Sequence, residues 1–380
     1  MTLGILGGGQ LGYMLALAGY PLGLHFRFLD PSPEAPVGRI AQRVTADYTD
    51  HAALEKFANG LELVTYEFEN VPVEAAKFLA KRVPVYPPPL ALEAAQDRLA
   101  EKTLFRNLGI STTDFLPIAK PGDFEAAVKQ LGLPAVLKTS RMGYDGKGQW
   151  ILRTAQDVAK ARSELPKVAL ILERFVPFAR ELSVLAVRSR TGEITFYPLV
   201  ENHHRGGILR LSLAPAPSLE PPIQRAAEDI ARRVLESLKY AGVLAIEFFE
   251  HEGRLLANEM APRVHNSGHW TIEGAVTNQF ENHLRGVLGL PLGSTAAAGC
   301  CAMVNLIGDL PEPSEVLAVT DAHLHLYGKV ARPGRKLGHV TLRAASPERL
   351  ALRLSELPAF FHRPHFCLDS ALVQSASHRI

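Results

Sequence analysis

Short apolar runs alternate with stretches of helical periodicity along the first hundred residues. A short run suits a buried strand, whereas a longer periodic stretch suits a helix packed against it. This rhythm is typical of βαβ units built on a parallel sheet. The strand-like runs are Leu3 to Leu6, His25 to Leu29 and Leu61 to Tyr66, and the first helical stretch is Leu11 to Ala18.

The pattern changes at a group of prolines between Pro84 and Pro89. Proline fixes φ and removes a backbone donor, so it interrupts strands and helices alike. A polar, helix-forming stretch from Ala91 to Leu108 follows the prolines. We therefore predict a Rossmann-like, parallel-sheet domain over residues 1–98.

A second alternation of strands and helices begins after Asp114, and it predicts a compact α+β lobe over about residues 114–181. Apolar strands and a helix continue to Leu290, which gives a middle domain over residues 99–290. After Pro291 the short strands predict a small β-rich domain over residues 291–380. The expected strands are Phe115 to Ile118, Ala135 to Lys138, Gln149 to Leu152, Val168 to Glu173, Leu182 to Ser189, Glu193 to Val200, Ala302 to Ile307, His323 to Tyr327 and Gly338 to Leu342. The expected helices are Phe124 to Leu131, Pro222 to Lys239 and Pro347 to Glu356.

Length and composition support a globular protein of more than one domain. A chain of 380 residues exceeds the size at which one hydrophobic core keeps growing. Apolar residues form 47% and charged residues 21% of the chain, which is ordinary globular usage. The net charge of +2 is too small for the broad basic surface that duplex binding needs, so no nucleic-acid partner is expected.

Cysteine usage and the first residues bear on the compartment. The three cysteines show neither the spacing of a zinc site nor that of a secreted disulfide framework. The opening residues lack the basic start of a signal peptide, and no apolar run reaches membrane-spanning length. We expect a cytoplasmic protein that does not enter a membrane.

A glycine-rich turn follows the first predicted strand. Gly7 to Gly12 fits the G-x-G-x-x-G pattern, and Asp30 lies eighteen residues beyond the last glycine. Glycines there let backbone N–H groups approach an anion, which can be a dinucleotide pyrophosphate or a single phosphate. A tight turn without any ligand fits equally well, so the turn alone leaves all three interpretations open.

A nucleotide site is indicated by a lysine and a second glycine-rich segment. Lys138 ends an apolar strand, and the loop from Gly143 to Gln149 follows it. A triphosphate needs a fixed cation together with a closing cover of backbone donors, which these two features could supply. The segment is neither a P-loop nor a kinase glycine loop. The alternative is an ordinary hairpin with solvated lysines.

The strand that follows ends in polar residues suited to the rest of a nucleotide. Backbone groups of residues 173–176 could pair with an adenine edge, and Glu181 could accept from ribose hydroxyls. The four residues are Glu173, Arg174, Phe175 and Val176. A carboxylate that merely faces water remains the alternative for Glu173.

Two carboxylates are placed as a pair for magnesium. Glu247 lies within an apolar strand, where an unpaired carboxylate is costly. A three-residue hairpin loop would put Ala257 opposite Glu247 and Glu259 diagonal to Glu247 on the same face, at about 7–8 Å. Carboxylates at that separation can share magnesium ions that also hold phosphate oxygens. A structural carboxylate paired with an arginine is the alternative, and a two-residue turn would spoil this geometry.

Arginine, histidine and amide side chains follow directly in the segment Arg263 to Trp270. Arginine meets a planar carboxylate with a bidentate fork. Arg263, His265 and Asn266 could therefore orient bicarbonate.

Taken together, these motifs resemble the 5-(carboxyamino)imidazole ribonucleotide synthases of purine biosynthesis, a family of ATP-grasp ligases. The R-V-H-N-S-G-H-W string is specific to this branch, whereas the lysine and the carboxylates are shared more widely. The likeness runs nearly end to end through Gly9 to Gly12, Asp97 to Leu99, Asn202 to His204, Gly207 to Arg210 and Arg332 to His339.

The resemblance implies an ATP-grasp fold of three domains and a homodimer that consumes ATP, bicarbonate and aminoimidazole ribonucleotide with Mg²⁺. It also implies that the product passes to a mutase of the same pathway. The residues implied to contact ATP are Arg98, Lys138, Gly143, Tyr144, Asp145, Gly146, Lys147, Gly148, Gln149, Glu173, Arg174, Phe175, Val176, Glu181, His204, Asn258 and Glu259. Those implied for the ribonucleotide are Gln10, Glu67, Tyr144 and Asp145, with Lys329, Arg332 and Arg335 at its phosphate. Glu247 and Glu259 would hold magnesium, while Arg263, His265 and Asn266 would hold carboxyphosphate or the carbon dioxide that it releases.

Asp145 is the candidate to remove the amine proton, and Lys138 is the cation expected at the transferring phosphoryl group. Two positions depart from the family pattern. Tyr13 replaces a common arginine, and Met142 replaces a common glycine.

Other functions remain open on the sequence. A formate-dependent glycinamide ribonucleotide transformylase or a biotin carboxylase would use the same nucleotide grip. An NAD-dependent oxidoreductase would rest on the first glycine turn and would leave Glu247 and Glu259 unexplained. A binding module without catalysis would hold nucleotide but would not hydrolyse it.

Overall fold

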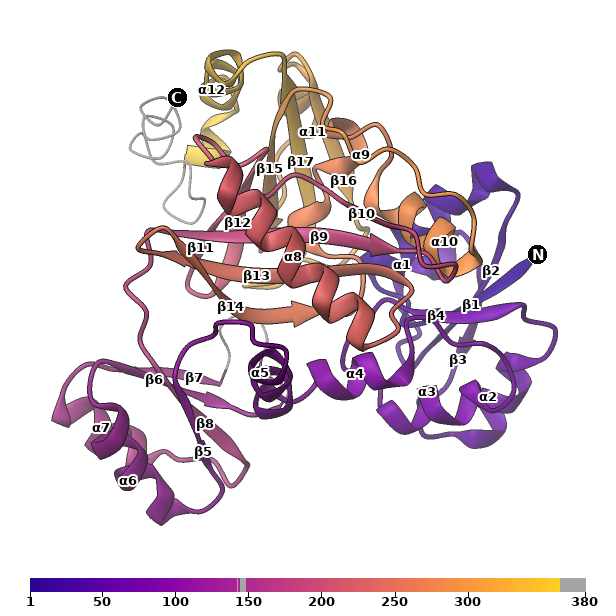
Figure 1. Cartoon of the computed structure of the whole chain (residues 1–380). Helices are drawn as coiled ribbons and strands as arrows, with labels where there is room; N and C mark the ends of the chain where they lie inside the picture. The colour runs from indigo at the N-terminus through magenta and orange to yellow at the C-terminus, as the bar shows by residue number, and fades with distance from the viewer. Residues whose placement is uncertain (142, 144–147, 363–380) are drawn as a thin grey trace.

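The computed structural model describes residues 1–141, 143 and 148–362. Within these ranges the strands form two four-stranded sheets and one nine-stranded sheet. The smaller sheets lie at opposite sides of the lower half of Figure 1, and the large sheet rises between and above them. No helix of the described ranges is long and apolar enough to cross a membrane.

The N-terminal unit is the predicted parallel sheet with helices on both faces. Its strands are ordered β3-β2-β1-β4 and all pair in parallel. Helix α1 packs on one face, whereas α2 and α3 cover the other. Strand β3 is an edge strand without a long apolar run, and the sequence pattern missed it. The elements are β1 (Thr2–Leu6), α1 (Gln10–Gly19), β2 (His25–Asp30), β3 (Gln42–Thr45), α2 (His51–Ala58), β4 (Leu63–Tyr66) and α3 (Val73–Ala80), with short 3₁₀ turns at Tyr20–Leu22 and Pro36–Arg39.

The helix-forming stretch predicted from Ala91 to Leu108 folds as two helices, α4 (Pro89–Ala95) and α5 (Arg98–Asn107). Asp97 stands at the break and caps α5 by accepting from the N–H groups of Leu99 and Ala100. The same carboxylate accepts from Ser140 and Arg141 of the next lobe. The break therefore ties the joint to the lobe that follows.

The lobe at the lower left of Figure 1 is an antiparallel sheet in the order β5-β8-β6-β7. Two helices cover one of its faces through a small core that includes Phe124, Leu137 and Leu172. The pairing of Lys138 with Gln149 brings the lysine strand against the end of the glycine-rich segment. The elements are β5 (Phe115–Ile118), α6 (Pro121–Leu131), β6 (Ala135–Thr139), β7 (Gln149–Leu152), α7 (Ala155–Ser163) and β8 (Leu170–Arg174).

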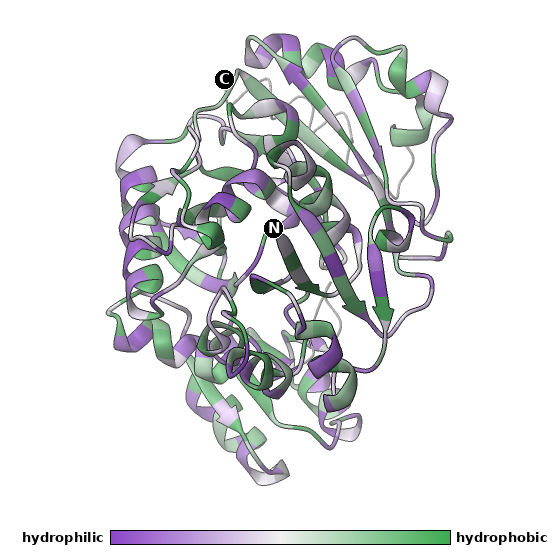
Figure 2. Ribbon diagram, turned by 90° about the vertical axis from the view of Figure 1, so that its right-hand side faces the viewer, coloured by the Kyte–Doolittle hydropathy of each residue, from purple (hydrophilic) through white to green (hydrophobic). Residues whose placement is uncertain are grey.

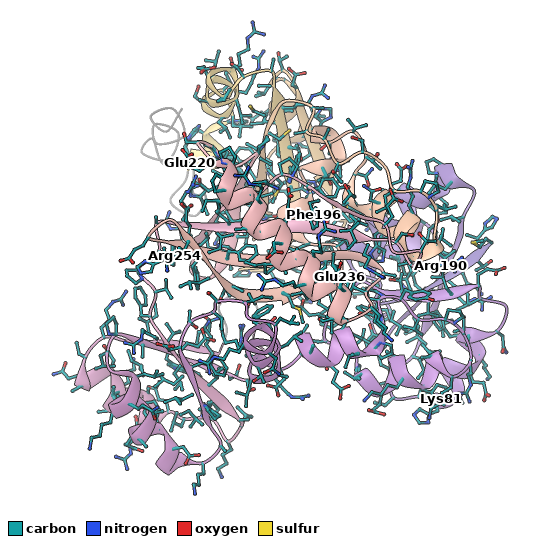
Figure 3. All side chains as sticks on the ribbon, in the orientation of Figure 1. Lys81, Arg190, Phe196, Glu220, Glu236 and Arg254 are labelled. Atoms are coloured by element: carbon teal, nitrogen blue, oxygen red, sulfur yellow. The ribbon has the colours of Figure 1, made fainter. Side chains whose placement is uncertain are left out.

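The large sheet has the order β14-β13-β9-β11-β12-β15-β17-β16, with β10 paired to β9. Helix α8 crosses one face, and its ends are marked by Glu220 and Glu236 in Figure 3. The expected strand over 193–200 is wrong, since the chain forms two strands there with Tyr197 and Leu199 buried between them. The elements are β9 (Arg180–Arg188), β10 (Ile194–Phe196), β11 (Val200–Arg205), β12 (Ile208–Ala214), α8 (Pro221–Ser237), β13 (Gly242–His251) and β14 (Arg254–Ala261).

The strands of the predicted tail domain extend this same sheet. Antiparallel pairing of β12 with β15 joins them to the middle unit, so the two parts share one continuous ladder. The elements are α9 (Thr271–Gly274), α10 (Gln279–Leu288), β15 (Cys300–Ile307), α11 (Pro313–Leu317), β16 (Ala322–Leu326), β17 (Lys336–Ala344) and α12 (Pro347–Ser355), with 3₁₀ turns at Asn266–Gly268 and Ala359–His362.

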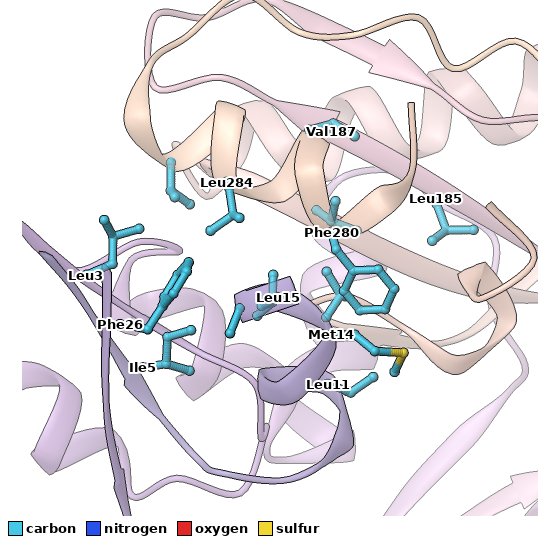
Figure 4. Packing of buried hydrophobic residues seen from close by; sticks show 14 of the residues in the cluster. Leu3, Ile5, Leu11, Met14, Leu15, Phe26, Leu185, Val187, Phe280 and Leu284 are labelled. Carbon is cyan, nitrogen blue, oxygen red and sulfur yellow. The ribbon is translucent and has the colours of Figure 1, made fainter. Parts of the chain in front are cut away.

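The N-terminal unit is fixed to the large sheet by a shared hydrophobic core. Leu11 and Leu15 of α1 pack with Phe280 and Leu284 of α10, as Figure 4 shows. The peripheral helices in Figure 2 carry both purple and green stretches, as expected for elements with one face on a sheet. Burial of these apolar side chains holds residues from distant parts of the sequence around one cavity.

Candidate active site

The two carboxylates expected to bind metal lie directly opposite each other, in a register that differs from the predicted one. The hairpin loop contains two residues, since His251 pairs with Arg254, so the expected three-residue loop is wrong. A two-residue loop in regular register would send Glu259 to the face opposite Glu247. A β-bulge at Asn258 shifts the ladder by one residue and pairs Glu247 with Glu259. The shared face that the sequence predicted is thus produced by a bulge.

Side chains of α5 hold the bulged strand from outside the sheet. Lys102 Nζ donates to Asn258 O at 3.2 Å, and Glu101 Oε1 accepts from Met260 N–H at 2.6 Å. Strand β14 is the edge strand of the sheet in the described ranges, so these backbone groups face no further strand. These two buried side chains therefore complete the hydrogen bonding of the segment that carries Glu259.

The charges around the carboxylate pair are unequal. Arg98 Nη1 donates to Glu259 Oε2 at 2.8 Å. Although burial opposes it, this arginine together with Lys138 lowers the pKa of Glu259 to about 2. Burial and the adjacent Glu259 carboxylate raise the pKa of Glu247 to about 7. Glu247 is therefore the less compensated carboxylate of the two.

The donor set fits magnesium. Two carboxylates lie side by side, and the buried Oδ1 atom of Asn258 has no hydrogen-bond partner among the described residues. Mg²⁺ is typically held by one or two carboxylates together with phosphate oxygens and water. Within the described ranges no group of three or more His, Cys, Asp or Glu side chains could hold a metal alone.

Lys138 is held by a buried network of charges. Its Nζ lies 2.8 Å from Glu173 Oε2, and Lys102 Nζ lies 3.6 Å from the same oxygen. Burial raises the pKa of Glu173, but the two lysines outweigh it and lower that pKa to about 2. The Glu173 side chain is therefore buried and paired, and does not face water.

Glu181 and His204 form a second pair on neighbouring strands. His204 Nδ1 lies 2.9 Å from Glu181 Oε2. Burial lowers the pKa of His204, but the hydrogen bond to Glu181 and the nearby Glu247 carboxylate raise it overall.

The bicarbonate candidates lie next to this cluster. Arg263 Nη2 pairs with Glu69 Oε2 at 2.7 Å, and His265 Nε2 lies 3.3 Å from Glu247 Oε1. Asn266 and Asn305 join their amides in a reciprocal pair at 3.0 and 2.7 Å. That pair leaves Asn266 one N–H and one lone pair for a ligand.

The first glycine turn does not support a dinucleotide site. Glu67 Oε1 accepts from Gly9 N–H at 2.8 Å and Glu67 Oε2 from Gly12 N–H at 3.2 Å, while Asp30 accepts from Gly8 N–H at 2.6 Å. The donors that would meet a pyrophosphate are thus bonded to carboxylates. A Cβ on Gly9 would lie 2.8 Å from Glu67 Oε1, so close packing of this carboxylate explains the glycine.

Cationic residues of the C-terminal segment lie beside this turn. Lys329 Nζ donates to the side chain of Gln10, and Arg335 Nη1 donates to Val330 O at 3.1 Å. Tyr13, which replaces a common arginine, is partly buried and packs against the hydrophobic core that joins α1 to α10. It therefore adds packing where the family pattern has a charge.

One cavity of about 740 Å³ collects residues from all three predicted domains. Its lining includes thirteen of the predicted site residues: Gln10, Glu67, Arg98, Gly143, His204, Glu247, Glu259, Arg263, His265, Asn266, Lys329, Arg332 and Arg335. The lining does not include Lys138, Gly148, Gln149, Glu173, Arg174, Phe175, Val176, Glu181 or Asn258. Tyr144, Asp145, Gly146 and Lys147, together with Met142, lie outside the described residues.

Comparison with known proteins identifies the family. A relative from Pseudomonas aeruginosa, an N5-carboxyaminoimidazole ribonucleotide synthase, is 55% identical over 94% of this chain and 99% of its own length. The chain belongs to the N5-carboxyaminoimidazole ribonucleotide synthase family. A relative of the same name from Brucella melitensis is 46% identical over 90% of this chain and 95% of its own length.

Family models and solved structures agree with this family. The models matched are the ribonucleotide synthetase preATP-grasp domain (residues 1–96), the ATP-grasp domain (103–280) and the phosphoribosylaminoimidazole carboxylase C-terminal domain (301–353). A crystal structure of N5-carboxyaminoimidazole ribonucleotide synthetase from Thermus thermophilus has a TM-score of 0.90 and 62% identity over 93% of this chain and 97% of that one. A crystal structure of N5-carboxyaminoimidazole synthase from Aspergillus clavatus, in complex with ADP and 5-aminoimidazole ribonucleotide, has a TM-score of 0.87 and 29% identity. The match covers 100% of this chain and 99% of that one. The predicted ATP-grasp fold is confirmed, whereas the domain limits and residue roles stay predictions.

Sequence reasoning missed several residues that shape the site of this family member. Glu69 pairs with Arg263, and Lys336 lines the cavity beside Arg335. Glu101 and Lys102 are buried beneath β14. The available signals were the position of Lys336 inside the segment Arg332 to His339 and that of Glu69 two residues after Glu67, whereas Glu101 and Lys102 resembled ordinary polar positions of an exposed helix.

Replacing Glu101 by alanine should destabilise the bulged strand of this synthase-family chain. Burial and the nearby Glu259 raise the pKa of Glu101 to about 8, so the side chain is largely protonated at pH 7. Alanine leaves the Met260 N–H without an acceptor, at a cost of about 1–3 kcal/mol. Glutamine keeps an acceptor and resembles the protonated acid, so Glu101→Gln should restore most of the loss. Denaturant unfolding measures the stability of both variants. Equal stability of Glu101→Ala and Glu101→Gln would contradict the role of Glu101 as the acceptor for the Met260 N–H.

Proposed function

We infer that this chain catalyses the ATP-dependent carboxylation of 5-aminoimidazole ribonucleotide by bicarbonate, through carboxyphosphate, giving N5-carboxyaminoimidazole ribonucleotide, ADP and phosphate in purine biosynthesis. The observation that carries the inference is the single cavity in which two carboxylates, an Arg–His–Asn cluster and a cationic tail segment meet. The named relatives, which cover almost the whole chain, support the same reaction.

We propose that the nucleotide lies between the antiparallel lobe and the large sheet. Lys138, fixed by Glu173, would offset charge on the transferring phosphoryl group, with Arg98 beside it. Bound Mg²⁺ would neutralise phosphate charge and would be held by Glu247 and Glu259. Backbone of residues 173–176 remains the proposed contact for adenine and Glu181 the proposed contact for ribose, and His204 remains a proposed contact to ATP.

Bicarbonate would be oriented by Arg263, His265 and Asn266 for attack on the γ-phosphate. Carboxyphosphate would then decompose to carbon dioxide and phosphate next to the ribonucleotide. The amine nitrogen would bond to the carbon of carbon dioxide and lose a proton, and the closeness of the two reactants gives this step a high effective concentration. Exclusion of water protects the reactive intermediate. Asp145 stays the proposed base, although it lies outside the described residues.

The ribonucleotide would lie at the opposite end of the cavity. Gln10 and Glu67 come from the N-terminal unit, while Lys329, Arg332 and Arg335 come from the tail. Three cations at one end suit its phosphate. We also propose a cytoplasmic homodimer whose product passes to a mutase, a proposal supported by the family resemblance.

The reaction is tested by omitting one component at a time. ADP and phosphate release should require both bicarbonate and aminoimidazole ribonucleotide for full rate, and formate should not replace bicarbonate. Formate-dependent turnover with glycinamide ribonucleotide would favour the transformylase, and biotin-dependent turnover would favour biotin carboxylase. Nucleotide binding without any turnover would favour a non-catalytic module.

Arg335→Ala should raise the KM for aminoimidazole ribonucleotide and leave the KM for ATP unchanged. Loss of a charged hydrogen bond to phosphate costs about 1.5–3 kcal/mol, or about tenfold to a hundredfold in affinity. Steady-state kinetics with each substrate varied measures the effect. Arg349→Ala, an exposed arginine on α12, serves as the control. A larger change in the KM for ATP than in the KM for the ribonucleotide would show that Arg335 does not bind the ribonucleotide phosphate.

A further inference from the structure

A buried chain of polar side chains runs behind His265. Ser212 Oγ lies 2.7 Å from Asn202 Oδ1, and Asn202 Nδ2 lies 2.8 Å from Ser183 Oγ. Ser183 Oγ lies 2.9 Å from Ser267 Oγ, and Ser267 Oγ lies 2.9 Å from His265 Nδ1. The three serines have no exposed surface, and Asn202 is 4% exposed. A polar row without solvent is costly unless every member is satisfied.

The direction of these hydrogen bonds is set at both ends. Asn202 Oδ1 can only accept, so Ser212 donates to it, and Asn202 Nδ2 donates to Ser183. Ser183 then has one hydrogen, which it donates to Ser267, and the Ser267 hydroxyl donates to His265 Nδ1. The backbone N–H of Ser267 also approaches His265 Nδ1, at 3.3 Å. Nδ1 is therefore the unprotonated nitrogen.

The opposite direction fails at the histidine. If Asn202 were flipped, each hydroxyl would donate the other way, and His265 Nδ1 would carry the hydrogen. That hydrogen would face the Ser267 N–H, whose nitrogen lies 3.3 Å from Nδ1. Two N–H groups pointing at each other would repel. One direction satisfies all members of the chain.

We propose that Ser183, Asn202 and Ser212 are positioning residues that hold His265 as its Nε2–H tautomer and aim that N–H at Glu247 and at the bicarbonate-derived group. Which ring nitrogen carries the hydrogen is set by the partner of the other one. Ser183 is also the direct cross-strand neighbour of Glu247, so the row and the carboxylate share one face of the sheet. His265 then acts as an oriented donor to an oxygen that gains charge.

The kinetic part of this proposal rests on the proposed function, but the tautomer does not. The ¹⁵N spectrum of histidine-labelled protein, with His265 assigned by the loss of its signal in His265→Gln, reports the tautomer without any substrate. At neutral pH the wild-type spectrum should show a bare Nδ1 and a protonated Nε2. A protonated Nδ1 would overturn the proposal even if no variant folds.

Ser183→Ala and Ser267→Ala should shift the His265 signal toward a mixture of tautomers. The kcat of the complete reaction should fall about tenfold to a hundredfold, as for other outer partners of a working histidine, while the KM for ATP stays within about twofold. Ser189→Ala is the matched control, because this buried serine directly follows the same strand and its hydroxyl accepts within its own turn.

A structural role alone would lower the stability of Ser183→Ala without moving the tautomer or kcat, and that result would overturn the proposal. A shifted tautomer with unchanged kcat would overturn the catalytic half. Absence of turnover in the wild-type protein would instead refute the proposed function, while the spectrum would still decide the hydrogen-bond direction.

Discussion

Glu259→Ala should abolish substrate-dependent ATP hydrolysis. The variant would lose one of two opposed carboxylates and would leave Arg98 without its partner at 2.8 Å. Glu247 would then be the sole carboxylate of the pair, and a single carboxylate holds Mg²⁺ weakly. Loss of metal-assisted charge stabilisation affects the transition state directly, so kcat should fall by more than about 10³-fold. Phosphate release with all substrates present measures it.

The same variant needs a control for folding and for surface charge. Glu236→Ala removes an exposed carboxylate from α8 and should keep full turnover (Figure 3). Titration of magnesium and ATP should show weakened binding to Glu259→Ala only. Near-normal turnover in this variant would refute the metal assignment.

Lys138→Met should cost both stability and activity. Methionine fills a similar volume but removes the closer of the two lysines, and leaves Glu173 with Lys102 at 3.6 Å and the Thr113 hydroxyl at 3.5 Å. Removing one partner of a buried ion pair typically costs about 3–5 kcal/mol. The phosphoryl group would also lose its fixed cation, so kcat should fall by about 10²-fold or more. Denaturant unfolding followed by tryptophan fluorescence, to which Trp150 of the same lobe contributes, measures the first effect.

The stability difference should depend on pH in a defined direction. The folded pKa of Glu173, about 2, lies below its usual value of 4.5, so the folded state binds fewer protons. The contribution of the ionised Glu173 side chain to the free energy of unfolding is complete above about pH 4.5 and is lost as the pH falls toward 2. The difference in the free energy of unfolding between wild type and Lys138→Met should therefore become smaller as the solution is acidified.

Lys160→Met, an exposed change on α7 of the same lobe, is the matched control and should leave stability unchanged. Equal stabilities of wild type and Lys138→Met at pH 7 would show that the network around Glu173 does not hold the lobe. Normal turnover would remove Lys138 from the phosphoryl site.

Much of the fold followed from periodicity. Apolar runs located β1, β2 and β4, because strands buried on both faces have few polar positions. The same rule missed β3, whose residues Gln42–Thr45 are only partly buried. The break between α4 and α5 was missed too, although Asp97 is a favourable helix cap. Helix propensity alone does not reveal such a break, because it does not take into account that a capping residue can begin a new helix within the stretch.

Residue types and motif spacing carried most of the proposed site. A lysine, paired carboxylates and an Arg–His–Asn cluster can be recognised from residue type alone, and the cavity is lined by thirteen of the predicted site residues. The predicted hairpin register was wrong, because bulges depend on what pairs with the backbone. At Asn258 that partner is Lys102, far away in the sequence.

The order of amino acids was thus enough to specify which chemical groups this chain has, many of its strands and its family. The bulge that pairs Glu247 with Glu259, and the carboxylates that occupy the first glycine turn, arose only on folding. The same holds for the direction of the hydrogen bonds behind His265. Local patterns fix backbone preference and burial, whereas register, charge state and proton position depend on partners that only folding brings within a few ångströms.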